Sequence, residues 1–225
     1  MKDEETKPKR KKYLREPASG FTHLAGVILA ISGLVLLIVY SALYATAWHV
    51  VSMTVFGVCL ILLYTASTLY HLLPLSPKGV AFFRKLDHMM IFVLIAGTYT
   101  PICLVPLRGA FGWTLFGLIW FLAASGIFLK AFWIGAPRRL STVFYILMGW
   151  LVVVAFLPLW RELPHAALAW MVAGGLFYTF GAVIYALKIP KGKFLGFGFH
   201  EIWHIFVLLG SFSHFWLMFR YVIYL

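Results

Sequence analysis

The chain has 225 residues, of which 63% are hydrophobic and only 12% are charged. Such an apolar composition excludes an ordinary water-soluble domain. The formal net charge of +12 would suit nucleic acid, but seven of the nineteen Lys and Arg residues precede Glu16. The densest group of basic residues therefore lies in a short tail of the kind that faces lipid headgroups. We expect an integral membrane protein whose partners are membrane lipids, and no nucleic acid.

Seven apolar runs of membrane-spanning length follow the tail, separated by short breaks rich in Pro, Gly and charge. They occupy 22–44, 48–72, 87–107, 111–134, 140–159, 165–187 and 200–221. Helices satisfy their own backbone polar groups in lipid, and no period-2 alternation indicates a barrel. The sequence predicts a basic, disordered cytoplasmic tail over 1–18, followed by an all-α bundle of seven transmembrane helices over 19–225.

The distribution of Lys and Arg predicts the orientation of this bundle. With the N-terminus inside, the tail and the inner loops hold sixteen of the nineteen basic residues, and the outer segments hold only Arg108, Arg161 and Arg220. Such a strong excess of basic residues in every second loop fits an odd number of spans. We expect a multi-pass protein of the cell (inner or plasma) membrane, with the N-terminus in the cytoplasm and the C-terminus outside.

Titratable side chains gather at the cytoplasmic ends of the predicted spans. Five of the eight histidines and three of the last four acidic residues lie there, namely His23, His71, His88, His200, His204, Glu16, Asp87 and Glu201. Ionisable groups near membrane depth are costly and are candidates for function. For any one of these histidines the alternative is an interfacial residue bonded to a headgroup or a backbone carbonyl.

The spacing of three histidines predicts a metal site. His200 and His204 are i and i+4, so they share one helix face about 6 Å apart, and His71 at the end of another span would supply a third nitrogen. Zinc accepts neutral imidazole, and a catalytic site keeps one position for water. We expect Zn²⁺ on these three residues, with Asp87 as the proton acceptor and Ser67, one turn before His71, orienting the water.

Two further features of the last span leave alternatives open. The run His200-Glu-Ile-Trp-His204 also fits the H-E-x-x-H pattern of metalloproteases, with Glu201 as the base. No third-ligand pattern follows it, and Glu201 is also a favourable charge at a helix start. His214 lies ten residues beyond His204, about 15 Å along the helix, so it either hydrogen-bonds another helix or lines a substrate cavity.

Four motifs together give the chain a family resemblance. They are Glu16-Pro-Ala-Ser-Gly-Phe-Thr-His23, Ser67-Thr-Leu-Tyr-His71, Lys85-Leu-Asp87-His88, and His200-Glu-Ile-Trp-His204 with the later His214-Phe. This set resembles the haemolysin III proteins, the bacterial branch of the progestin and adipoQ receptor (PAQR) family, which is similar to alkaline ceramidases. The resemblance covers nearly the whole chain beyond the tail.

The resemblance implies a zinc ion near the cytoplasmic face, held by His71, His200 and His204, with Ser67 and Asp87 beside it. Glu16, Ser19 and His23 match a recurrent family motif and are expected next to the site and not as ligands. His88, Glu201 and His214 are also expected next to the site, and Glu201 departs from the family pattern by adding a carboxylate beside the ligand pair, which leaves the identity of the general base open.

The family offers three functional hypotheses. The first is a zinc-dependent hydrolase of a lipid amide or ester that contributes to membrane lipid homeostasis. The second is a membrane sensor or receptor in which Asp87 closes a structural zinc site. The third is a haemolysin that forms a pore as a homo-oligomer, because span centres this apolar do not line a channel within one chain.

Overall fold

The structure is a computed structural model that describes residues 13–133, 138–192 and 197–225. These residues form helices and no β-strand. The elements are α1 (Pro17–Tyr44), α2 (Ala47–Leu72), α3 (Pro77–Leu104), α4 (Ala110–Phe132), α5 (Arg138–Trp150), η1 (Leu151–Ala155), α6 (Phe156–Glu162), α7 (His165–Leu187), α8 (Phe199–Arg220) and η2 (Val222–Tyr224). Residues 1–12 of the expected tail, and the basic residue Lys193, lie outside the described residues.

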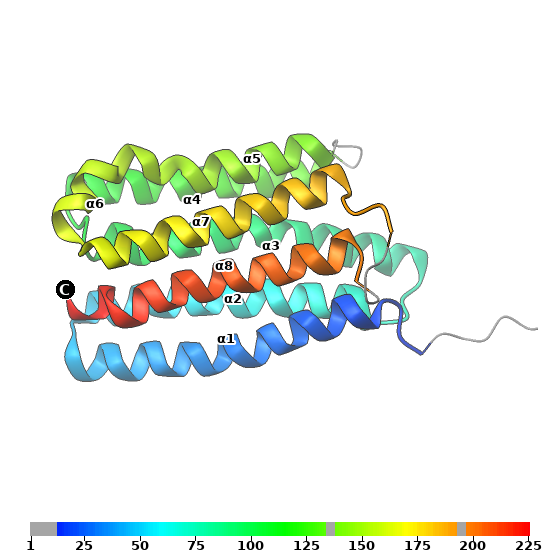
Figure 1. Ribbon diagram of the computed structural model, residues 1–225, viewed down its shortest axis with the longest axis horizontal. Coiled ribbons are helices and arrows are strands. Elements are labelled where there is room, and N and C mark those ends of the chain that lie inside the picture. The colour runs from blue at the N-terminus through cyan, green and yellow to red at the C-terminus, as the bar shows by residue number, and fades with distance from the viewer. Residues whose placement is uncertain (1–12, 134–137, 193–196) are drawn as a thin grey trace, which may run out of the picture.

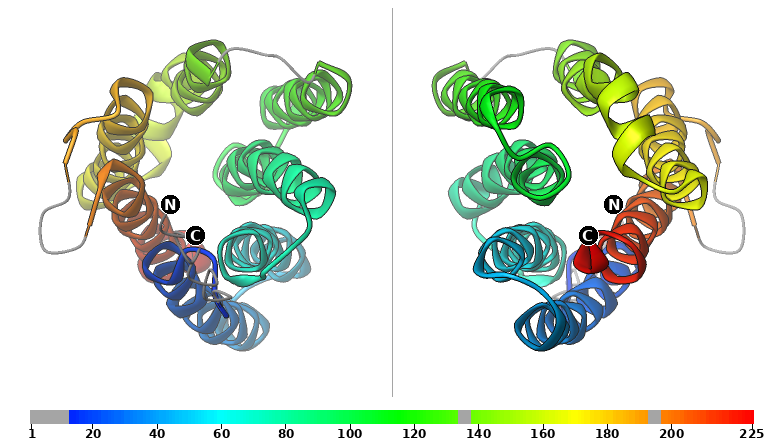
Figure 2. Two further views of the ribbon diagram at one scale, coloured as in Figure 1. Left: turned by 90° about the vertical axis from the view of Figure 1, so that its right-hand side faces the viewer. Right: turned by 90° about the vertical axis from the view of Figure 1, so that its left-hand side faces the viewer.

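The long helices run side by side and alternate in direction. In Figure 1, α1, α3, α5 and α8 begin at one end of the bundle, and the C-terminus lies at the other. The end-on views show the helices following one another around the bundle, with α8 returning to α1 (Figure 2). This closure brings the start of α1 next to the start of α8 and the end of α2. Three segments that are distant in the sequence therefore meet at one end of the bundle.

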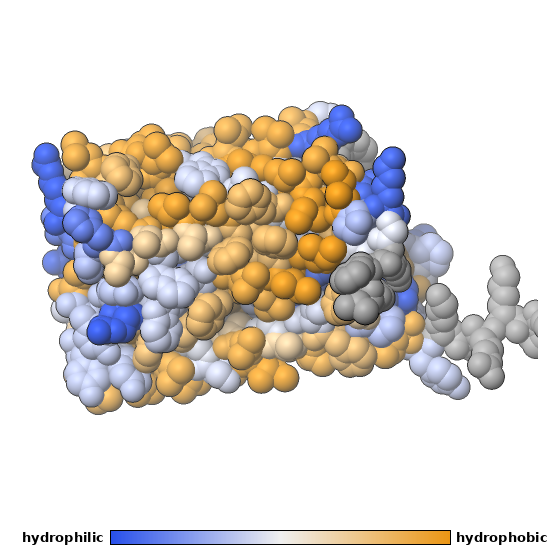
Figure 3. All heavy atoms as spheres, viewed as in Figure 1, coloured by the Kyte–Doolittle hydropathy of each residue, from blue (hydrophilic) through white to orange (hydrophobic). Residues whose placement is uncertain are grey.

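The surface of the bundle is that of a membrane protein. Figure 3 shows hydrophobic side chains over the middle of the visible face and hydrophilic ones gathered at its two ends. Six stretches of the described chain are long and apolar enough to cross a membrane, namely Pro17–Tyr44, Ala47–Leu72, Ala110–Phe132, Arg139–Glu162, His165–Leu187 and Phe199–Tyr224. The predicted all-helical membrane bundle is thus confirmed.

Helix α3 differs from the other long helices. It is 28 residues long and packs between α2 and α4, but it is not among the six apolar stretches. It also begins ten residues before the apolar run expected at 87–107, because Ser76 and Pro77 start the helix within the preceding polar loop. Ser76 caps it by accepting a hydrogen bond from the Gly79 N–H at 3.3 Å, a favourable helix start. The seventh span stays a prediction.

The apolar run expected at 140–159 folds as three helical pieces, not one. The central piece, η1, has the sequence Leu-Val-Val-Val-Ala, and β-branched residues fit poorly in an α-helix. The break releases backbone groups that lipid cannot satisfy. The Tyr99 hydroxyl of α3 satisfies them, since it accepts from the Val152 N–H at 2.6 Å and lies 3.0 Å and 2.8 Å from the carbonyl oxygens of Met148 and Gly149.

We therefore expect Tyr99→Phe to destabilise the bundle. Removing this hydroxyl leaves buried backbone groups without a partner, at a cost of about 1–3 kcal/mol in the free energy of unfolding. Thermal unfolding of the purified protein in detergent measures the effect. Tyr40→Phe is the control, because no other residue in the described part of the chain hydrogen-bonds the Tyr40 hydroxyl. An equal loss in both variants would contradict this role of Tyr99.

Candidate metal centre

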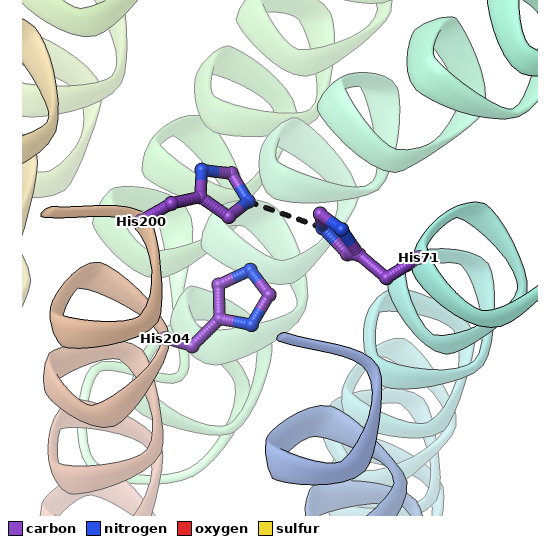
Figure 4. Close-up of side chains that lie close together, drawn as sticks. All are labelled: His71, His200 and His204. Atoms are coloured by element: carbon purple, nitrogen blue, oxygen red, sulfur yellow. Dashed lines mark hydrogen bonds between the residues drawn. The ribbon is translucent and has the colours of Figure 1, made fainter. Parts of the chain in front are cut away.

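Three histidines from two helices converge at the end of the bundle where α1 begins. His71 lies in the last turn of α2, and His200 and His204 lie in the first two turns of α8. Figure 4 shows the three rings pointing toward one another. One nitrogen from each ring lies within 4.8 Å of the others, and the Nε2 atoms of His71 and His200 are 3.1 Å apart.

The arrangement fits a metal ion. Two nitrogens bound tetrahedrally at 2.0–2.1 Å lie about 3.3 Å from each other, close to the 3.1 Å that separates Nε2 of His71 from Nε2 of His200. His71 and His204 are buried and His200 is partly buried, so the donors are removed from competing water. No Cys, Asp or Glu within the described ranges joins the three histidines, which leaves room for a further ligand.

The residues expected beside the site on α1 contact the ligand histidines. The Glu16 carboxylate lies 2.5 Å from Nδ1 of His71, and this hydrogen bond is the main reason that the pKa of Glu16 is below its usual value. The Ser19 carbonyl oxygen lies 3.0 Å from Nδ1 of His204. The His23 ring is buried and stacks on the His204 ring with centroids 3.6 Å apart.

Glu201 caps α8. One carboxylate oxygen accepts a hydrogen bond from the Gly198 N–H at 2.8 Å, and the other accepts from the Ser19 hydroxyl at 3.0 Å. Both oxygens are thus engaged in holding the start of α8 and joining it to α1. This geometry favours the helix-start role of Glu201 over the base of an H-E-x-x-H protease.

A cavity inside the bundle reaches one of the three clustered histidines, His204. Its volume is about 140 Å³, whereas one water needs about 10–15 Å³ on the same measure. Ser67 and Asp87 line it together with His23 and His204, and most of the remaining lining is apolar. The Ser67 hydroxyl is buried and lies beside the Asp87 carboxylate, so the two polar groups face the cavity together.

His88 and His214 stand apart from the three ligand histidines. Nδ1 of His88 donates to the Arg84 carbonyl oxygen at 2.6 Å, and its Nε2 lies 3.2 Å from the Tyr185 hydroxyl. His214 lines the same cavity as Asp87 and is stacked with Tyr178 at 5.7 Å between centroids. Neither belongs to the metal cluster.

Sequence reasoning missed two residues near the site. The Thr22 hydroxyl lies 3.1 Å from Nδ1 of His204, and its place one turn after Ser19 is a signal that helix spacing could have provided. Tyr145 of α5 lines the cavity and donates to the His88 carbonyl oxygen at 2.9 Å. No local pattern around Tyr145 indicates this contact, which depends on how α5 packs against α3.

Comparison with known proteins gives matches over nearly the whole chain. Residues 11–215 match the family described as Haemolysin-III related. The chain is 43% identical over 209 residues to Hemolysin-3 of Bacillus cereus, covering 92% of each, and 42% identical to the Hemolysin-3 homolog of Bacillus subtilis (strain 168), covering 92% of this chain and 94% of that one. It is 26% identical to the human Monocyte to macrophage differentiation factor, over 91% of this chain and 83% of the other.

We expect the protein purified in detergent to carry about one metal ion per chain, and His71→Ala and His204→Ala to lose it, because each removes one of three nitrogen donors. Elemental analysis identifies and counts the metal. His165→Ala is the control, since His165 begins α7 at the opposite end of the bundle. A well-folded wild-type protein without metal, or full metal content in both ligand variants, would contradict the site.

Proposed function

We propose that this chain, which belongs to the haemolysin III family, is a zinc-dependent hydrolase that cleaves an amide or ester bond in a membrane lipid. The observation that carries the proposal is a largely apolar cavity that is lined by Ser67, Asp87 and His204, the last of which belongs to the histidine cluster. A lipid places its carbonyl group where its headgroup meets its acyl chain. The cavity likewise combines a few polar side chains, those of Ser67, Asp87 and His204 among them, with mostly apolar walls.

The donor set supports zinc, which prefers imidazole nitrogen and four ligands. When bound there, zinc supplies a Lewis acid that polarises a carbonyl group and lets water act as a nucleophile near neutral pH. Three protein donors with room for a fourth ligand are typical of catalytic zinc. A purely structural zinc would need Asp87 as a fourth ligand, and Asp87 is not part of the metal cluster.

Asp87 and Ser67 supply the remaining chemistry. In hydrolysis the water oxygen bonds to the carbonyl carbon, its proton passes to the Asp87 carboxylate, and the same proton reaches the nitrogen or oxygen of the leaving group as its bond to carbon breaks. The Ser67 hydroxyl, which lies beside the Asp87 carboxylate, hydrogen-bonds the water or the carbonyl oxygen and holds it near Asp87.

The apolar part of the cavity would hold the acyl chain. Helices α2, α3, α5, α7 and α8 all contribute lining residues, and dry, apolar walls favour a hydrocarbon over water. The same walls make an ion path through a single chain unfavourable. Cleavage of lipids by a protein embedded among them would contribute to membrane lipid homeostasis.

We further propose seven spans, with α3 as the seventh, and a cytoplasmic metal centre. Helix α1 begins at one end of the bundle and the C-terminus lies at the other (Figure 1), which fits an odd number of crossings. The histidine end of the bundle also carries most of the basic residues beyond the tail, as the positive-inside rule expects of a cytoplasmic face.

This orientation predicts which end of the chain reacts from outside the cell. Leu225→Cys should react with a membrane-impermeant maleimide on intact cells, whereas Tyr13→Cys should react only after permeabilisation. Tyr13 is exposed, and the two native cysteines, Cys59 and Cys103, are buried. Labelling of Tyr13→Cys on intact cells would reverse the proposed orientation.

The hydrolase proposal predicts turnover by the zinc-loaded protein. We expect it to release fatty acid from a ceramide-like amide or a phospholipid ester, measured by mass spectrometry, and Asp87→Asn to lower kcat by about 10²–10⁴-fold, the usual contribution of a general acid–base group. Thr98→Val is the control, because Thr98 lines the cavity but its hydroxyl already donates to the Leu94 carbonyl oxygen. Zinc-loaded wild type that cleaves neither class would contradict the activity.

A further inference from the structure

The first two turns of α1 touch both helices that carry the ligand histidines. This segment, residues 16–23, is called the α1 clip below. On the α2 side, the Glu16 N–H donates to the His71 carbonyl oxygen at 2.9 Å. On the α8 side, the Ser19 hydroxyl donates to Glu201 at 3.0 Å. The clip therefore spans the gap between the two ligand-bearing helices.

The clip determines which nitrogen of His71 faces the metal site. The Glu16 carboxylate lies 2.5 Å from Nδ1 of His71, and a carboxylate can only accept a hydrogen bond. Nδ1 must therefore carry the proton, which leaves the lone pair on Nε2. That Nε2 atom is the one that lies 3.1 Å from Nε2 of His200. Arg15 supports the carboxylate, since the two side chains are 3.6 Å apart.

The clip imposes the same tautomer on His204. Nδ1 of His204 lies 3.0 Å from the Ser19 carbonyl oxygen, which is also only an acceptor. The Thr22 hydroxyl lies 3.1 Å from the same nitrogen, and it donates its own hydrogen bond to the Ser19 carbonyl oxygen at 2.8 Å. It too must accept from Nδ1–H, so Nε2 of His204 keeps its lone pair.

His23 completes the clip by holding the plane of the His204 ring. The two rings are parallel within 9°, with centroids 3.6 Å apart. On its other side the His23 ring meets the edge of Tyr64, 5.1 Å between centroids. The His204 ring can therefore rotate only if α1 moves, because its nitrogen and its face are both held by residues of the clip.

We propose that the α1 clip orients His71 and His204 for the metal, with Glu16 and Thr22 as positioning residues, and that metal binding and docking of the clip stabilise each other. The inference rests on the metal centre that the proposed function requires, and not on hydrolytic activity. The coupling follows from linkage: a metal that binds better when the clip is docked must favour the docked state to the same extent.

The test measures metal affinity without turnover. Detergent-purified protein is stripped with a chelator and titrated with Co²⁺, whose visible absorption reports the ligand geometry, and affinity is obtained by competition with a chelator of known strength. We expect Glu16→Gln to lose about 10–100-fold in affinity, the usual effect of removing a partner of a metal-bound histidine. Thr22→Val should lose less, because the Ser19 carbonyl still holds Nδ1 of His204.

Glu162→Gln is the matched control, because it removes an exposed carboxylate at the opposite end of the bundle. If Glu16→Gln does not fold, metal affinity is measured in Glu16→Asp instead. The shorter side chain keeps the negative charge but holds it farther from Nδ1 of His71. Wild-type affinity and an unchanged cobalt spectrum in the folded Glu16 variants would overturn the proposal.

The coupling has its own readout in amide hydrogen exchange. Metal should slow exchange at the first hydrogen-bonded amides of α1, such as that of Gly20, which donates to the Glu16 carbonyl oxygen at 3.0 Å, and the effect should shrink in Glu16→Gln. Exchange that is insensitive to metal in the wild type would overturn the coupling.

The outcomes separate this inference from the proposed function. If the wild type binds metal and Glu16→Gln binds it equally well, the clip proposal fails and the hydrolase proposal stands. If the variants behave as expected but no lipid is cleaved, only the hydrolase proposal fails. If the wild type binds no metal, both fail.

Discussion

The hydrogen bond between Glu16 and His71 decides how the histidines at this end of the bundle meet. The carboxylate of Glu16 holds the proton of His71 on Nδ1, so Nε2 presents a lone pair to Nε2 of His200 at 3.1 Å. A metal ion, or an Nε2–H of His200, can satisfy this lone pair. The packing of α1, α2 and α8 at this end of the bundle serves to maintain that geometry.

Local features of the site were predictable from the sequence because they depend on helix geometry alone. The i, i+4 spacing places His200 and His204 on one face of any helix, and the structure does bring His71 to the same cluster. That third residue was predicted less directly, from its place at the end of an apolar run, and its partners lie 129 residues and more further along the chain. The all-helical membrane fold followed from composition and run length.

Features that depend on packing were not predictable in the same way. From the sequence, Glu201 could be either a helix cap or the general base of a protease. Its hydrogen bonds from the Gly198 N–H and the Ser19 hydroxyl favour the helix cap. Likewise, nothing in the apolar run at 140–159 indicates that the Tyr99 hydroxyl, from another helix, would hydrogen-bond the free backbone groups at a break within the run. The role of Thr22 was missed because it needs α1 to lie against α8. Each of these depends on which helices become neighbours.

X-ray absorption at the edge of the bound metal tests the central claim most directly, because it counts the scattering atoms around the ion without requiring a substrate. In the wild-type protein purified in detergent, we expect three imidazole ligands, recognised by the outer atoms of their rings, and one further oxygen ligand at distances typical of zinc. A shell with fewer than two imidazoles, or a folded protein with no metal edge at all, would contradict a metal centre built from His71, His200 and His204.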